Sequence, residues 1–204
     1  MTLDALRPVA ERLLEPLVGG AKRVGLTPDG VSVLAIVAAV GAGVSFYGAG
    51  QEPLLYLVGA VMVFFNGVLD LLDGALAREL DVASPAGDLL DHVLDRYADL
   101  IIIAGLAAGT NQYALGFAAV TGVLMTSYLG TQAEAVGLDR VYGGLLGRAD
   151  RLAVTGVVGV VATVVHTTLY GLTVVGWLLV VFAVVGHLTA LQRFYYAMRD
   201  LTED

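Results

Sequence analysis

Four aspartates with regular spacing are the residues of this sequence most able to do chemistry. Asp70 and Asp73 lie three residues apart, and Asp91 and Asp95 lie four residues apart. Each pair shares one face of a helix, because successive residues turn by about 100° around the helix axis. Two such faces set against each other would place four carboxylates around a small cavity. Oxygen-only ligands suit Mg²⁺, Mn²⁺ or Ca²⁺, so the spacing predicts a divalent-cation site.

Small residues share the helix faces of these aspartates. Gly74 and Ala77 lie on the face of the first pair, with Arg78 at its edge, and Gly87 lies on the face of the second pair. They leave room for a ligand to approach the helix backbone. Carboxylates that hold hard cations beside an open cavity can bind pyrophosphate esters, because the metal neutralises phosphate oxygens and stabilises the leaving group.

These residues have four interpretations other than a metal site that binds pyrophosphate esters. Acidic residues can be solvated helix ends, which is the role expected of four others: Glu79, Asp81, Asp88 and Asp99. The glycines can be notches at which membrane helices pack closely. A cation transporter would need acidic residues near mid-membrane on several helices. A membrane prenyltransferase also uses Asp-rich motifs and Mg²⁺, but it would need more spans and a second motif far along the chain.

The elements that position these side chains have the composition of a membrane protein. Of 204 residues, 57% are hydrophobic and 15% are charged, whereas about 25% are charged in a typical soluble domain. Six apolar runs, allowing for a polar end, are long enough to cross a bilayer as helices: 31–47, 53–69, 100–108, 113–129, 152–165 and 172–191. We therefore expect an all-α polytopic membrane protein with six transmembrane helices. The net charge of −8 argues against a nucleic-acid partner.

The basic residues predict which side of the membrane each connection faces. All 11 Lys and Arg lie before the first run, between the second and third, between the fourth and fifth, or after the sixth. The other three connections contain none. Because cytoplasmic loops collect Lys and Arg, both termini and the aspartate cluster are expected on the cytoplasmic side of the cell membrane.

Residues 2–18 have the pattern of an amphipathic helix. Apolar residues repeat at helical spacing and charged residues occupy the other face, which favours a juxtamembrane helix lying in the interface. A soluble cap packed on the bundle is the alternative. We divide the chain into this juxtamembrane unit, residues 1–25, and a six-span domain, residues 26–204. Thr27 and Ser84, each followed by proline, are expected to begin helices.

Residues 70–95 read D-x2-D-G-x2-A-R-x8-G-x3-D-x3-D, which resembles the signature of the CDP-alcohol phosphotransferase family. The six-span layout with an N-terminal helix resembles that family too. The resemblance implies that two divalent cations, Mg²⁺ or Mn²⁺, are held by Asp70, Asp73, Asp91 and Asp95, and that Asp95 is also the general base. It implies a CDP-binding set as well: Gly74, Ala77, Arg78, Ser84, Gly87 and Asp29. Members of the family are usually homodimers.

The resemblance also implies a reaction, in which an acceptor alkoxide attacks the β-phosphorus of a CDP-linked lipid and CMP leaves. Ser127-Tyr128 and the segment 148–151 resemble members that make inositol-phosphate lipids from a phosphorylated polyol acceptor. Those members carry basic residues after the Ser-Tyr pair, whereas this chain has Leu-Gly-Thr-Gln. Glycerol phosphate and serine therefore stay open beside inositol phosphate. We expect the acceptor's phosphate to be held by Ser127, Arg148, Arg151 and Arg193.

Overall fold

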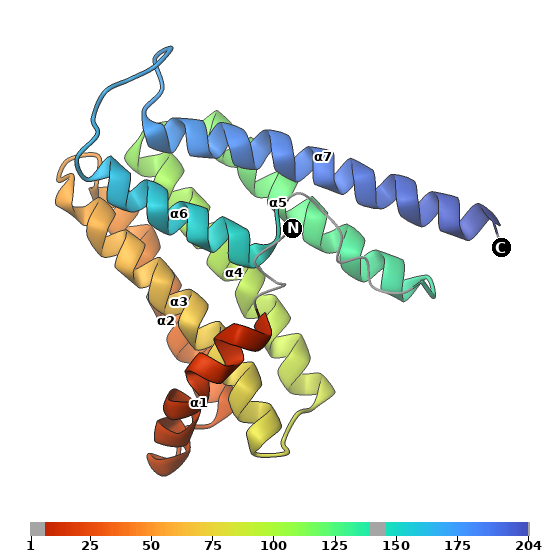
Figure 1. Cartoon of the computed structure of the whole chain (residues 1–204). Coiled ribbons are helices and arrows are strands. Elements are labelled where there is room, and N and C mark those ends of the chain that lie inside the picture. The colour runs from red at the N-terminus through yellow and green to blue at the C-terminus, as the bar shows by residue number, and fades with distance from the viewer. Residues whose placement is uncertain (1–6, 139–145, 204) are drawn as a thin grey trace.

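The computed structural model describes residues 7–138 and 146–203, and these residues form helices and no strand (Figure 1). The seven described helices are α1 (Arg7–Arg23), α2 (Pro28–Gly48), α3 (Leu54–Glu79), α4 (Pro85–Gly109), α5 (Tyr113–Ala135), α6 (Arg148–Ala162) and α7 (Val174–Glu203). Each of the six predicted apolar runs lies wholly or largely within one of the helices α2 to α7. The all-α prediction is confirmed.

The helices fit a multi-pass membrane protein. Four described helices are long and apolar enough to cross a bilayer: α2, α3, α5 and α7. Large apolar side chains such as Val37, Phe65 and Phe117 are exposed on these helices. The helix α6 has 15 residues, about 22 Å at 1.5 Å per residue, which is less than the roughly 30 Å of a hydrocarbon core. The first half of α4 carries the charged residues of the cluster. Length and composition therefore give four candidate spans among the described helices, and the prediction of six spans is not confirmed.

Side-chain caps begin the two helices that the sequence marked by a capping residue and proline. The Thr27 hydroxyl accepts a hydrogen bond from the Gly30 amide at 3.2 Å at the start of α2. The Ser84 hydroxyl accepts one from the Gly87 amide at 3.1 Å at the start of α4. Each cap satisfies an amide that has no partner within its own helix. Both predicted helix starts are confirmed.

Close backbone contacts pack α2 against α4. A Cβ added at Gly105 would lie against the backbone of Gly43, and one added at Gly43 would lie 2.8 Å from the Ile101 carbonyl oxygen. Only residues without a side chain permit this approach, as in other membrane helix pairs. The buried Phe46 ring fills the neighbouring layer, directly beside Gly59 of α3. These close approaches lie at glycines outside the aspartate motif, whereas a Cβ added at Gly87 within it would meet its nearest neighbour at an ordinary 3.5 Å.

The N-terminal helix α1 packs on the ends of α2 and α3. Its Ala21 joins a buried cluster with Val31, Leu72 and Leu76, and the Lys22 ammonium lies 3.0 Å from the Glu79 carboxylate. The helix begins at residue 7, so the first part of the predicted segment 2–18 lies outside the described residues.

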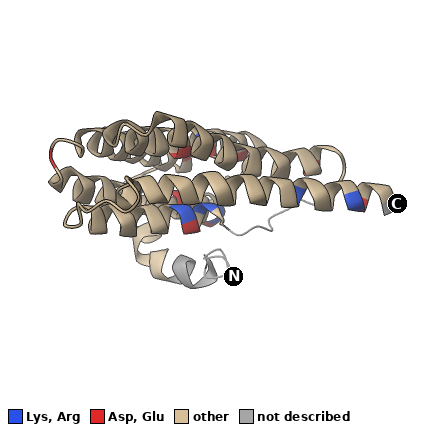
Figure 2. Cartoon of the chain, turned by 90° about the horizontal axis from the view of Figure 1, so that it is seen from above, with Lys and Arg blue, Asp and Glu red and all other residues tan. Residues whose placement is uncertain are grey.

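The Lys and Arg visible in Figure 2 lie at the middle of the bundle and toward the C-terminus, and none is seen at the opposite end. In Figure 1 the turn between α3 and α4 lies at the bottom, the start of α6 near the middle and the C-terminus of α7 at the right. The opposite connections, at 49–53, 110–112 and 163–173, contain no Lys or Arg. The Lys and Arg of the described helices therefore lie away from these three connections, which is the one-sided distribution on which the predicted orientation rests.

Candidate active site

An open cavity of about 1620 Å³ lies among the helices α3 to α7. Its lining changes along α3 from apolar residues, including Ala60 and Phe64, to the polar residues Asp70 and Asp73. The lining of α6 changes in the same way, from valines near its end to arginines near its start. The cavity therefore joins a charged region with an apolar wall.

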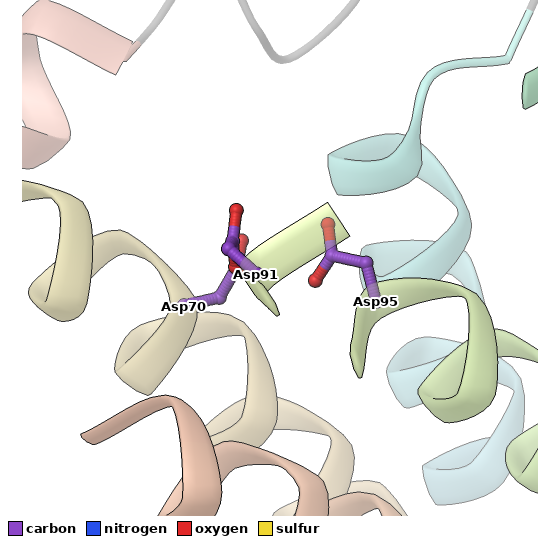
Figure 3. A group of neighbouring side chains, drawn as sticks. All are labelled: Asp70, Asp91 and Asp95. Atoms are coloured by element: carbon purple, nitrogen blue, oxygen red, sulfur yellow. The ribbon is translucent and has the colours of Figure 1, made fainter. Parts of the chain in front are cut away.

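Three of the four predicted metal ligands meet in this charged region. Carboxylate oxygens of Asp70 on α3 and of Asp91 and Asp95 on α4 lie within 4.8 Å of one another (Figure 3). Each residue is partly buried. Carboxylates this close repel each other unless a proton or a cation compensates them. An all-oxygen donor set beside an open cavity fits Mg²⁺ or Mn²⁺, so the residues present suit the predicted ion.

The fourth predicted ligand, Asp73, lines the same cavity but has a different neighbour. Its Oδ2 accepts a 2.6 Å hydrogen bond from the hydroxyl of Ser32, and both residues are buried. Ser32 lies on α2, one turn after the helix begins, and it was not predicted from the sequence. The hydrogen bond ties Asp73 of α3 to α2.

Arg148 bridges the two helices that carry the aspartates. Its Nη1 lies 2.5 Å from Asp70 Oδ1, and its Nη2 lies 2.7 Å from Asp95 Oδ1. One guanidinium at the start of α6 therefore binds carboxylates of both α3 and α4. The planar fork of arginine makes such a bridge possible, whereas the single ammonium of lysine does not present two parallel donors.

Arg151 forms a second ion pair one turn further along α6. Its Nη2 lies 2.6 Å from Asp99 Oδ2, and both side chains are buried. The prediction that Asp99 is a solvated helix end is therefore wrong. Asp99 continues the stripe of Asp91 and Asp95, whose members are spaced four residues apart. This stripe faces the interior of the bundle. The same prediction is confirmed for Glu79, Asp81 and Asp88, which are exposed.

The residues expected to hold the acceptor's phosphate all line the one cavity: Ser127, Arg148, Arg151 and Arg193. Arg193 donates a 2.6 Å hydrogen bond to the Thr126 carbonyl oxygen. Ser127 receives a hydrogen bond from Arg96, which also lies 3.5 Å from the Asp95 carboxylate. Arg96 was not predicted from the sequence, because it adjoins the aspartate stripe rather than belonging to it.

The residues expected to bind CDP lie along the cavity and at two helix starts. Gly74 lines the cavity. A Cβ added at Gly87 would lie 3.5 Å from the Ser84 hydroxyl and 3.9 Å from Asp29 Oδ1, so these three residues are neighbours. Asp29 is on α2 and Ser84 caps α4, so two separate helix starts meet here. On α3, Ala77 is half-buried and Arg78 is exposed.

The chain belongs to the CDP-alcohol phosphatidyltransferase family, whose model matches residues 25–185. It is an enzyme of this family, as the resemblance predicted. The archaetidylinositol phosphate synthase of Methanothermobacter thermautotrophicus is 30% identical over 98% of this chain and 95% of its own length.

Solved structures of a relative have the same fold. The phosphatidylinositol phosphate synthase of Mycobacterium tuberculosis with CDP-DAG bound has a TM-score of 0.76 and 29% identity, covering 91% of this chain and 94% of that chain. The same synthase in complex with manganese and citrate has a TM-score of 0.76 and 28% identity, covering 90% and 88%. A divalent cation thus accompanies this fold in a relative, in agreement with the predicted cofactor.

Proposed function

We propose that the protein transfers the phospholipid part of a CDP-linked lipid to inositol phosphate and releases CMP. The observation that carries this proposal is one cavity, which joins the aspartate cluster and four arginines to an apolar wall. A CDP-linked lipid has the matching chemistry, because its pyrophosphate is anionic and its tails are apolar. The fold of a synthase with CDP-DAG bound supports the same substrate class.

The apolar wall gives the lipid tails a place beside the charged region. It is formed by α3 and α6 and includes Ala60, Phe64, Val68, Val157 and Val160. These residues precede the aspartates along α3 and follow the arginines along α6. The tails would therefore extend along the helix axes, away from the end that carries the basic residues.

Two divalent cations, Mg²⁺ or Mn²⁺, would be held by Asp70, Asp73, Asp91 and Asp95. When bound, they neutralise pyrophosphate oxygens and stabilise the departing CMP. The CDP part would contact residues of α3 and of the starts of α2 and α4: Gly74, Ala77, Arg78, Ser84, Gly87 and Asp29. Gly74 and Gly87 keep the backbone open to the nucleotide, and the Ser32 hydrogen bond holds Asp73 in place.

Asp95 would act as the general base. Its carboxylate takes the proton of the acceptor hydroxyl, and the acceptor oxygen forms a bond to the β-phosphorus. The bond between that phosphorus and the bridging oxygen breaks, and CMP carries the electron pair away. Asp95 belongs to the cluster and lines the cavity, and its Oδ1 lies 2.7 Å from Arg148 Nη2, so it adjoins both the predicted cation site and the predicted phosphate site.

The acceptor's phosphate would bind Ser127, Arg148, Arg151 and Arg193 at the same end of the cavity. Charge-assisted hydrogen bonds from arginine are strong and directional toward phosphate. Inositol phosphate is favoured over glycerol phosphate and serine because the relatives are synthases of archaetidylinositol phosphate and phosphatidylinositol phosphate. The four uncharged residues after Tyr128 imply that these arginines, rather than a neighbouring lysine or arginine of that segment, neutralise the phosphate.

The proposal includes six spans, with α4 and α6 crossing beside the four candidate spans α2, α3, α5 and α7, and a helix α1 at the membrane interface. Both termini and the site would lie on the cytoplasmic side of the cell membrane, as the one-sided distribution of basic residues supports. A homodimer is also predicted. Cysteine accessibility is a clean test of sidedness, because the chain has no cysteine of its own.

An acceptor screen tests the proposed reaction. The purified full chain in lipid nanodiscs would receive a CDP-linked lipid with radiolabelled cytidine, in diacyl and archaeol forms, together with inositol phosphate, glycerol phosphate, serine or free inositol. We expect CMP release with inositol phosphate. CMP release with glycerol phosphate alone would overturn the assignment of inositol phosphate as the acceptor. No CMP release with any of the four compounds would overturn the proposed reaction. A prenyltransferase would release inorganic pyrophosphate from a prenyl diphosphate instead.

A further inference from the structure

Arg148 occupies the centre of the aspartate cluster rather than its edge. It contacts Asp70 at 2.5 Å and Asp95 at 2.7 Å, and its side chain is 14% exposed. These carboxylates are two of the three whose oxygens lie within 4.8 Å of one another. Among the described residues, the buried Nε of Arg148 has no hydrogen-bond partner. Within the described structure, the guanidinium is therefore held by its two ion pairs.

We propose that Arg148 and the divalent cation compete for Asp70 and Asp95, and that cation binding frees the guanidinium for the acceptor's phosphate. A cation bonded to these carboxylates withdraws the negative charge that holds the guanidinium and repels its positive charge. The acceptor's phosphate then supplies the anionic partner that the guanidinium has lost. The second half of this inference rests on the proposed function.

The other arginines of the cavity have different anchors. Arg151 is held by Asp99 at 2.6 Å, away from the candidate ligands. Arg193 donates to the Thr126 carbonyl oxygen. Arg96 lies 3.5 Å from Asp95 and also contacts Ser127. Arg148 differs from all three because it spans two candidate metal ligands at once, so its release depends most directly on the cation.

Thermodynamic linkage makes the competition measurable. If the cation releases Arg148 and the released side chain binds phosphate, the cation and the acceptor must each raise the other's affinity by the same factor. Coupled sites typically show factors of about 5–150. Removing the guanidinium should therefore tighten cation binding and abolish most of the coupling.

The test measures Mn²⁺ binding to the purified full chain in detergent, without CDP-lipid, by electron paramagnetic resonance of the free ion. Arg148→Gln should bind Mn²⁺ on the order of tenfold more tightly than the wild type, within the range expected for coupled sites. Arg148→Lys keeps the charge but cannot span both carboxylates, and it should bind Mn²⁺ several-fold more tightly, about fivefold. Arg193→Gln is the matched control, since it removes one positive charge from the same cavity.

A second titration measures inositol phosphate binding by calorimetry with and without Mn²⁺. Mn²⁺ should raise the wild type's affinity for inositol phosphate by about the same factor as the Arg148→Gln substitution raises the affinity for Mn²⁺. In Arg148→Gln itself, Mn²⁺ should raise the affinity for inositol phosphate much less. Direct bonding of phosphate to the metal would persist in both proteins, so the difference between them isolates Arg148.

Unchanged or weaker Mn²⁺ binding by both Arg148 variants would overturn the competition. An increase in Mn²⁺ affinity in Arg193→Gln as large as that in Arg148→Gln would also overturn it, because general charge repulsion would then be the cause. CMP release by the wild type separates this inference from the proposed function. Normal release with unchanged Mn²⁺ affinity in the variants overturns the competition alone, whereas tighter Mn²⁺ binding without any CMP release supports the competition and overturns the reaction.

Discussion

The buried ion pair between Asp99 and Arg151 makes a demanding prediction about stability. Its atoms lie 2.6 Å apart, and the two side chains are 4% and 8% exposed. The substitution Asp99→Asn keeps the size of the side chain but leaves the Arg151 guanidinium buried without this counter-ion. Breaking a buried pair by removing one partner costs about 3–5 kcal/mol. Because whole domains are stable by about 5–15 kcal/mol, the variant should lose a large part of its free energy of unfolding.

The assay is equilibrium unfolding in mixed detergent micelles, followed by circular dichroism and by the fluorescence of Trp177, the one tryptophan of the chain. Asp88→Asn is the matched control on the same helix, because the side chain of Asp88 is 74% exposed. That control should change the free energy of unfolding by no more than about 0.5 kcal/mol.

The double substitution Asp99→Asn with Arg151→Gln removes both charges. It should recover much of the loss, because two neutral amides can hydrogen-bond to each other and no unpaired charge remains buried. Equal free energies of unfolding for Asp99→Asn and Asp88→Asn would refute this account of the ion pair. A double variant less stable than Asp99→Asn would refute it too.

Three further predictions test the site and its frame. Asp95→Asn should still bind the CDP-linked lipid in a filtration assay but lose about 10²–10⁴-fold in CMP release, the usual contribution of a general base; near-normal turnover would reject that role. Gly105→Ala should lower the yield of folded protein and its melting temperature, because the added methyl group meets the backbone of Gly43; an unchanged melting temperature would contradict the close approach. Ser32→Ala should cost about 1–3 kcal/mol in the unfolding assay and weaken Mn²⁺ binding, because Asp73 loses its 2.6 Å hydrogen bond; wild-type Mn²⁺ affinity would show that this bond does not orient a ligand.

Much of the site could be predicted because its ligands are close in sequence. Asp91 and Asp95 share a face through helix geometry alone, and α3 and α4 are joined by a short turn. The same periodicity carried one more signal, since Asp99 lies four residues after Asp95. The charge of Asp99 favours an exposed position, whereas its place on the stripe favours the interior of the bundle. The side chain is buried because Arg151 lies within reach as an ion-pair partner.

Local patterns along the chain were enough to predict the helices, their capped starts at Thr27 and Ser84, the one-sided distribution of basic residues and the shared face of the aspartates. All of these depend on residues within a few turns of one another. The packing of separate helices was needed to show that Ser32 binds Asp73 and that Arg148 bridges Asp70 and Asp95. Helical periodicity defines which face a residue occupies, but it does not say which face of another helix lies opposite. That choice follows from packing, where glycines bring α2 and α4 together and the buried charges take the partners within reach.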